Sequence, residues 1–71
     1  MVIAYLHAVP CPSCGRPHGL YLDAAFGFVR GLDYEYVCPG TGQRTRHQPG
    51  AAHTWVKGPP PGAVKARRVN P

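Results

Sequence analysis

The feature of this chain that most constrains its fold is the segment Cys11-Pro12-Ser13-Cys14-Gly15. Two cysteines three residues apart, with proline between them and glycine after them, predict a tight turn. In such a turn backbone N–H groups point at both sulfurs and the glycine takes a positive φ. A third cysteine begins a related turn, Cys38-Pro39-Gly40-Thr41-Gly42. The pattern predicts a β-rich domain organised around a bound metal ion.

The chain has 71 residues, which allows one domain with a small core. A chain of this length buries only about 60% of its unfolded surface, so a metal ion or disulfides usually stabilise such a fold. Three cysteines are an odd number, which disfavours a disulfide framework. A Cys11–Cys14 disulfide with Cys38 free is the alternative in an oxidising compartment.

No stretch of the sequence predicts a secretion signal or a membrane span. The apolar segment 2–6 is short and has no preceding positive charge, and no run reaches the roughly 20 apolar residues that cross a bilayer. We therefore expect a soluble protein without a membrane partner, in a reducing interior such as the cytoplasm or in a virion.

Five short segments have the composition and alternation of β-strands, and they predict two antiparallel hairpins followed by an edge strand. The first hairpin pairs residues 2–9 with 18–24, and the second pairs residues 33–38 with 43–48. A cysteine turn closes each hairpin, and residues 53–56 form the edge strand.

Alternation along these strands predicts which side chains share a face. In the first strand, Ile3, Tyr5, His7 and Val9 are expected on one face, and Val2, Ala4, Leu6 and Ala8 on the other. In the second hairpin, one strand carries Tyr34, Tyr36 and Cys38 on one face, and its partner carries Gln43, Thr45 and His47 opposite Arg44 and Arg46.

The apolar side chains outside the two hairpins are expected to cover the core. Residues 24–32 predict a loop, because Gly27 and Gly31 would break a longer helix. The side chains expected to cap the core from this loop and from the edge strand are Phe26, Phe28, Val29 and Trp55.

The C-terminal part of the chain differs in composition from the rest. Residues 1–57 are predicted as the β domain and residues 58–71 as an extended Pro-rich arm, because proline fixes φ and removes hydrogen-bond donors. The net charge is +5, and residues 44–71 contain no acidic side chain. This asymmetry indicates a partner surface. The residues expected to bind the partner are Arg44, Arg46, Lys65, Arg67 and Arg68.

The Cys-Pro-x-Cys-Gly turn at residues 11–15, followed by a second Cys-Pro turn at residues 38–39, resembles the zinc ribbon, a family of small β-hairpin modules with rubredoxin-like knuckles. The resemblance covers about residues 2–48. It implies one structural Zn²⁺ and contact with DNA, RNA or the machinery of transcription and translation. The second turn departs from the family pattern, because the fourth cysteine would fall at Thr41.

The identity of the fourth ligand is open, because structural zinc takes four ligands in Cys₄, Cys₃His or Cys₂His₂ sets. His18 lies just past the first turn, beside the expected metal. His47 lies four residues along its strand from the second turn, roughly 13 Å away at about 3.3 Å per residue. His47 or His53 as ligand, or a site without metal, are the alternatives. The expected set is Cys11, Cys14, Cys38 and His18.

The sequence lacks the groups of a catalytic centre, and we expect no enzyme. Catalytic zinc sites keep an open position and usually lie beside a carboxylate, and no glutamate accompanies the cysteine turns. Thioredoxin-like redox pairs begin a helix, and no helix is predicted after Cys14.

Two binding roles are consistent with the sequence. The first is a structural or accessory subunit of a larger protein assembly, such as a viral capsid or tail. The proline-rich arm has little with which to bury itself, and it would dock on other subunits of that assembly. The second is nucleic-acid binding or an association with transcription or translation, through basic side chains that contact phosphates.

Overall fold

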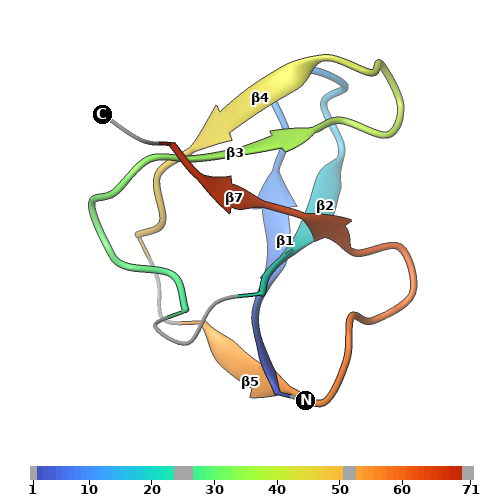
Figure 1. The fold of residues 1–71 in the computed structure, drawn as a ribbon. Helices are drawn as coiled ribbons and strands as arrows, with labels where there is room; N and C mark the ends of the chain where they lie inside the picture. The colour runs from blue at the N-terminus through green and yellow to red at the C-terminus, as the bar shows by residue number, and fades with distance from the viewer. Residues whose placement is uncertain (1, 24–26, 51–52, 70–71) are drawn as a thin grey trace.

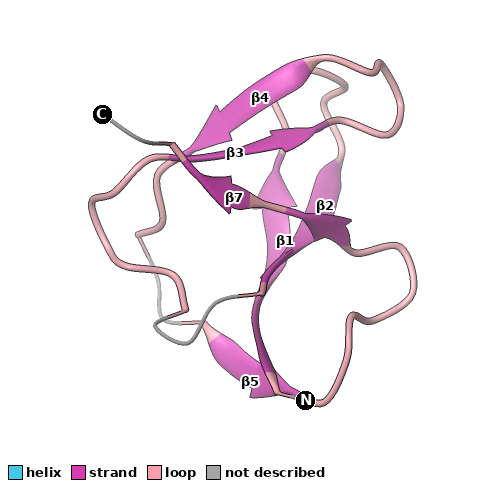
Figure 2. Ribbon diagram, viewed as in Figure 1, coloured by secondary structure: helices cyan, strands magenta, loops and turns pink. Residues whose placement is uncertain are grey.

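The computed structural model describes residues 2–23, 27–50 and 53–69, which form strands joined by loops (Figures 1 and 2). The strands are β1 (Ile3–Pro10), β2 (Pro17–Leu22), β3 (Tyr34–Val37), β4 (Arg44–His47), β5 (Thr54–Val56), β6 (Val64–Lys65) and β7 (Arg67–Arg68). A small all-β fold is therefore confirmed. In these described ranges, no helix is long and apolar enough to cross a membrane.

The strands form two sheets, one in the order β5-β1-β2-β6 and the other in the order β4-β3-β7. The β1–β2 and β3–β4 pairs are the two antiparallel hairpins that the sequence predicts. Figure 1 shows the second sheet crossing one end of the first, so that the two cysteine turns lie at the same side of the molecule.

The first strand contains a β-bulge that changes which side chains face the core. Leu6 pairs with Leu20 and Val9 pairs with His18, so β1 has one more residue than β2 between these pairs. Ala8 takes a φ of 55°, which accommodates the extra residue. The bulge turns Val9 to the same face as Leu6, and both side chains are buried. The predicted alternation is therefore wrong beyond Leu6, because a bulge interrupts the period of two.

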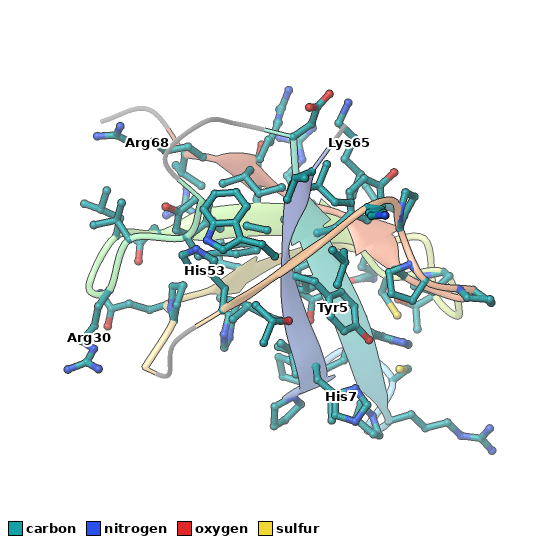
Figure 3. All side chains as sticks on the ribbon, turned by 90° about the horizontal axis from the view of Figure 1, so that it is seen from below. Tyr5, His7, Arg30, His53, Lys65 and Arg68 are labelled. Atoms are coloured by element: carbon teal, nitrogen blue, oxygen red, sulfur yellow. The ribbon has the colours of Figure 1, made fainter. Side chains whose placement is uncertain are left out.

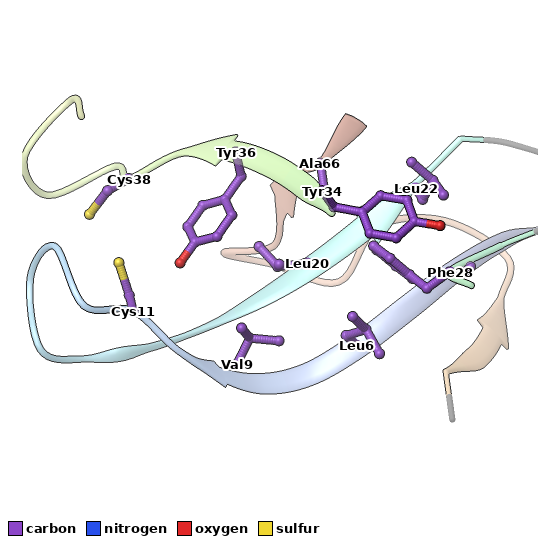
Figure 4. Packing of buried hydrophobic residues seen from close by; sticks show 11 residues of the cluster. Leu6, Val9, Cys11, Leu20, Leu22, Phe28, Tyr34, Tyr36, Cys38 and Ala66 are labelled. Atoms are coloured by element: carbon purple, nitrogen blue, oxygen red, sulfur yellow. The ribbon is translucent and has the colours of Figure 1, made fainter. Parts of the chain in front are cut away.

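The core lies between the two sheets (Figure 4). Tyr34, Tyr36 and Cys38 face it from the second hairpin, as alternation predicts, and each is at most 2% exposed. The other buried members come from the first sheet, from the loop before β3 and from the C-terminal segment. They are Ala4, Leu6, Val9, Cys11, Leu20, Leu22, Phe28 and Ala66.

The outer face of the second sheet is exposed and charged. Arg44 and Arg46 project from β4 on this face, whereas Thr45 between them lies on the other face, as predicted, and is buried. Glu35 lies opposite Arg46 in β4 and opposite Arg67 in β7. Directly opposed residues of antiparallel strands share a face, so these side chains form one charged surface.

The loop before β3 covers the core through one side chain of the predicted set. Phe28 is buried, and its ring meets that of Tyr34 edge-on with centroids 5.0 Å apart. Val29 is 42% exposed, so its predicted burial is wrong; its backbone N–H, and not its side chain, reaches inward and donates to the Tyr34 hydroxyl at 2.8 Å. Phe26 lies outside the described residues.

The edge strand β5 forms as predicted, but Trp55 does not dock on the core. β5 pairs with β1 at the end of the first sheet that lies away from the second sheet (Figure 1). Trp55 is therefore 50% exposed, and its ring meets that of His53 edge-on with centroids 5.0 Å apart.

The C-terminal segment differs most from the expectation of a separate extended arm. β6 pairs in parallel with β2, and β7 pairs with β3, so the segment joins both sheets. Ala66 lies between these strands, is 1% exposed and donates its N–H to the Tyr21 carbonyl at 2.8 Å. From Val64 onward the described residues are therefore an integral part of the β domain.

Candidate metal centre

The two cysteine turns have the same backbone geometry. The Gly15 N–H donates to the Cys11 carbonyl at 2.8 Å, and the Gly42 N–H donates to the Cys38 carbonyl at 2.7 Å. The two glycines have φ values of 76° and 73°, in the left-handed region that favours glycine. The second turn is therefore a structural repeat of the first, with Thr41 at the position of Cys14.

A side-chain contact joins the two turns. The hydroxyls of Ser13 and Thr41 lie 2.6 Å apart, although the two residues are 28 positions apart in the sequence. The Thr41 hydroxyl also accepts the Gln43 N–H at 3.3 Å. These bonds hold the turns beside each other, so that the sulfurs of both turns face one space.

Four side chains converge in that space. One ligand atom from each of Cys11, Cys14, His18 and Cys38 lies within 4.8 Å of the others. The Nε2 atom of His18 is 3.2 Å from the Cys14 sulfur and 3.7 Å from the Cys38 sulfur. Four sulfur and nitrogen donors at these separations can hold one metal ion.

The position of His18 follows from the first hairpin. It is the second residue of β2 and pairs with Val9, immediately after the bulge in β1. Its ring meets that of Tyr36 edge-on with centroids 6.5 Å apart. The turn and the neighbouring strand thus aim this imidazole at the cysteines, as its place in the sequence predicts.

The alternative histidines lie elsewhere. His47 pairs with Tyr34 at the far end of β4 from the cysteine turn, and burial lowers its pKa. The His53 ring lies between those of Phe28 and Trp55, at centroid distances of 6.1 and 5.0 Å. Neither belongs to the cluster of possible ligands in the described part of the chain.

Neighbouring polar groups favour the thiolate form of two of the cysteines. The Thr41 hydroxyl, together with His18 and two backbone N–H groups, lowers the pKa of Cys38 to about 5 although burial opposes the shift. The Tyr36 hydroxyl and backbone N–H groups of the first turn lower the pKa of Cys11. The Cys38 sulfur is therefore prepared to bind a cation at neutral pH, and the pKa of Cys11 is shifted in the same direction.

The pKa of the third cysteine, Cys14, is raised in part because several sulfurs lie close together. A backbone hydrogen bond from Arg16 lowers the pKa of Cys14, but burial and the sulfurs of Cys38 and Cys11 outweigh it and raise the pKa. Three thiolates in one buried space repel each other, and a bound divalent cation would remove this repulsion.

Tyr36 is a component of the site that the predicted ligand set does not include. Its hydroxyl is buried and has no partner at full hydrogen-bond geometry among the described residues. The same hydroxyl is near enough to Cys11 to lower the pKa of that thiol, and burial and the neighbouring sulfurs raise the pKa of Tyr36. Its position two residues before Cys38, on the same strand face, is the signal in the sequence.

The residues predicted to bind a partner lie on the second sheet and the adjoining β6. Arg67 donates from Nε to a Glu35 carboxylate oxygen, and the Nε of Arg44 lies 4.0 Å from the other oxygen. The Arg67 hydrogen bond, with the charges of Arg44 and Arg46, holds the pKa of Glu35 below its ordinary value. The Glu35 carboxylate is therefore ionised, and it holds the Arg67 side chain beside it.

A groove of about 370 Å³ runs beside this charged cluster. The charged side chains along it are Arg44, Lys65, Arg67 and Glu35. Arg68 pairs opposite Tyr34, so alternation places it on the other face of β7 from Arg67. Figure 3 shows Lys65 and Arg68 at separate positions on the surface. The structure thus brings together four of the five predicted residues.

Comparison of the chain with models of protein families, with curated proteins and with solved structures finds no match.

Proposed function

We propose that this protein is a non-catalytic interaction module, a small β domain held together by one structural Zn²⁺. The ligands are Cys11, Cys14, His18 and Cys38. The observation that carries this proposal is the convergence of their four donor atoms within 4.8 Å, at the point where the two hairpin turns meet.

The donor set fits zinc. Zinc–sulfur bonds of about 2.3 Å and zinc–nitrogen bonds of about 2.0–2.1 Å give donor separations of about 3.5–3.8 Å in a tetrahedron. The distances from His18 Nε2 to the Cys14 and Cys38 sulfurs, 3.2 and 3.7 Å, lie close to this range. A set of three thiolates and one imidazole also binds zinc in preference to the harder divalent cations.

A structural role for the ion follows from the origin of its ligands. Cys11, Cys14 and His18 belong to the first hairpin, whereas Cys38 belongs to the second. One ion therefore cross-links the two halves of a core that is small for an independent fold.

The same ligand set argues against catalysis. Four protein ligands complete a tetrahedral shell and leave no position for water or substrate. The three acidic residues of the chain stand apart from the cluster: Asp23 and Asp33 are not among its ligands, and Glu35 is bound to Arg67.

The partner that the charged surface supports best is a nucleic acid. Arg44, Arg46 and Arg67 surround one carboxylate, and Lys65 lies along the adjoining groove, so positive charge exceeds negative charge there. Tyr34 and Tyr36 are buried and unable to stack on bases, and the exposed Trp55 lies on β5, in the other sheet from Arg44, Arg46 and Arg67. Binding would therefore depend on phosphate contacts, with little sequence preference and strong salt dependence.

An accessory subunit of a larger protein assembly is the second candidate. Val37 and Trp55 are exposed apolar side chains, 54% and 50% accessible, which a protein contact would cover. A free docking arm no longer supports this role, because β6 and β7 pair within the domain.

Titration of labelled duplex and single-stranded nucleic acid at several salt concentrations tests the partner. The variant Arg44→Gln/Arg46→Gln/Lys65→Gln removes three charges from the surface and leaves the Arg67–Glu35 bond in place. We expect weaker binding and a shallower slope of log K against log salt. The slope should fall by about 0.9 for each duplex phosphate that the variant no longer neutralises.

The matched control removes three charges elsewhere, in Arg16→Gln/Arg30→Gln/Lys57→Gln, all of them exposed. It should bind like the unchanged protein, and zinc content and melting temperature should be equal in both variants. Equal weakening in the two variants would show only a response to net charge. Absence of binding at low salt would favour the protein-assembly role.

A further inference from the structure

The Tyr36 hydroxyl is a buried polar group without a satisfied hydrogen bond. The side chain is 2% exposed, and its oxygen has no partner at full hydrogen-bond geometry among the described residues. Buried hydroxyls in folded proteins are nearly always bonded, so an unsatisfied one requires an explanation. A hydrogen-bond acceptor that is present only in the metal-bound protein would explain the unsatisfied hydroxyl.

The surroundings of Tyr36 identify that group. The side chain extends from β3 between the two cysteine turns, and Figure 4 shows its hydroxyl pointing toward Cys11. Its ring meets His18 edge-on at 6.5 Å. Tyr36 therefore lies beside two of the four ligands and two residues before a third, Cys38.

Tyr34 shows that this arrangement is particular to Tyr36. It occupies the same face of β3 two residues earlier and is equally buried. Its hydroxyl accepts the Val29 N–H at 2.8 Å, and its ring packs on Phe28 at 5.0 Å. The first tyrosine of the pair is thus satisfied by the fold alone, and the second is not.

Cys11, unlike Cys38, has no hydroxyl at the equivalent position of its own turn. Cys38 interacts with the Thr41 hydroxyl in addition to backbone N–H groups of its own turn. Cys11 has backbone N–H groups of the first turn, and the structurally equivalent position in that turn is Cys14, which has no hydroxyl. Tyr36 directs its hydroxyl toward Cys11 from the neighbouring strand β3, outside the turn (Figure 4).

We propose that Tyr36 is a positioning residue of the metal centre, whose hydroxyl donates a hydrogen bond to the metal-bound Cys11 thiolate. This inference rests on the proposed zinc site. Three thiolates around one divalent cation have a net charge of −1, and a hydroxyl donor on the buried side of the site stabilises that charge. The phenol proton stays on oxygen, and no bond to the metal is made by Tyr36.

The test uses the full chain and the matched pair Tyr36→Phe and Tyr34→Phe. Each variant removes one buried hydroxyl from the same strand face. We expect Tyr36→Phe to weaken Zn²⁺ affinity, measured by chelator competition, by about tenfold, because partners of metal ligands usually contribute 10- to 100-fold. Tyr34→Phe should bind Zn²⁺ like the unchanged protein, even if its melting temperature falls.

A spectroscopic signature separates positioning from stability. In the Co²⁺-loaded proteins, Tyr36→Phe should shift the sulfur-to-cobalt charge-transfer band to lower energy, because a thiolate without a hydrogen bond holds its electrons less tightly. Tyr34→Phe should leave the band in place. Unchanged affinity and band in Tyr36→Phe, or equal changes in both variants, would overturn the proposal.

A measurement on the unchanged sequence applies if Tyr36→Phe fails to fold. In protein loaded with ¹¹³Cd²⁺, the Tyr36 hydroxyl proton should exchange slowly and show scalar coupling to the metal nucleus through the hydrogen bond. A metal-bound protein without this coupling refutes the role of Tyr36 alone. A chain that binds none of these ions refutes the zinc site as well.

Discussion

Replacement of Cys38 by serine is expected to release the metal ion and unfold the domain. Cys38 is fully buried and is the one member of the cluster that the second hairpin contributes. Structural zinc in zinc-finger peptides contributes about 10–16 kcal/mol of binding free energy, which is comparable with the whole stability of about 5–15 kcal/mol of an ordinary domain. The ¹H–¹⁵N spectrum should lose its dispersion, and native mass spectrometry should find no bound zinc.

Ser13→Ala is the matched control for this loss. It removes a hydroxyl from the first turn and breaks the 2.6 Å contact with Thr41, but it leaves all four proposed ligands in place. It should keep one zinc ion and lose only about 0.5–1.5 kcal/mol of stability, the usual net value of one hydrogen bond. A Cys38→Ser protein that melts cooperatively without metal would contradict the proposal that zinc holds the two hairpins together.

A cysteine at position 41 is expected to restore the site after His18 has been removed. His18→Ala alone should bind zinc more weakly, because three thiolates leave one coordination position without a protein ligand. Thr41 occupies the position in the second turn that Cys14 occupies in the first, and its hydroxyl already interacts with Cys38. The double variant His18→Ala/Thr41→Cys should therefore recover one zinc ion per chain in a Cys₄ set.

The control for this rescue is His18→Ala/Thr41→Ser, which has the same shape at position 41 but no thiol. It should bind zinc as weakly as His18→Ala does. Co²⁺ absorption distinguishes the restored Cys₄ centre, because a fourth thiolate adds intensity to the sulfur-to-cobalt bands. Failure of the cysteine variant to bind metal would mean that the two turns are equivalent in backbone geometry only.

The parts of the fold that can be predicted from the sequence are those with local causes. Proline and glycine around the cysteines determine both turns, and alternation in residues 33–38 and 43–48 determines the faces of the second hairpin. The place of His18 in the cluster is predictable because it follows Cys14 by four positions and the chain is still turning there. Each of these features depends on neighbours within a few positions, where chain geometry leaves few alternatives.

The parts that cannot be predicted depend on contacts between distant segments. The bulge at Ala8 arises where β1 must bring both Leu6 and Val9 to the core, and nothing in an alternating apolar segment marks it. β6 and β7 have two residues each, too few for a period to appear. Their pairing depends on the free edges of β2 and β3, which a single sequence does not reveal.

The same limit applies within the candidate site. The alternation of β3 predicts that Tyr36 is buried, but not that its hydroxyl lies beside Cys11, far earlier in the sequence. Likewise, alternation predicts Glu35 only as a residue on the outer face of a strand. Its bond to Arg67 depends on the register of β7 against β3.

X-ray absorption at the zinc edge of the purified full chain tests the central claim most directly. The Cys₃His centre predicts one zinc ion per chain, with three sulfur neighbours at about 2.3 Å and one nitrogen neighbour at about 2.0–2.1 Å. A shell with two or four sulfurs would contradict the ligand set. A chain that contains no metal and still unfolds cooperatively would contradict the metal centre itself.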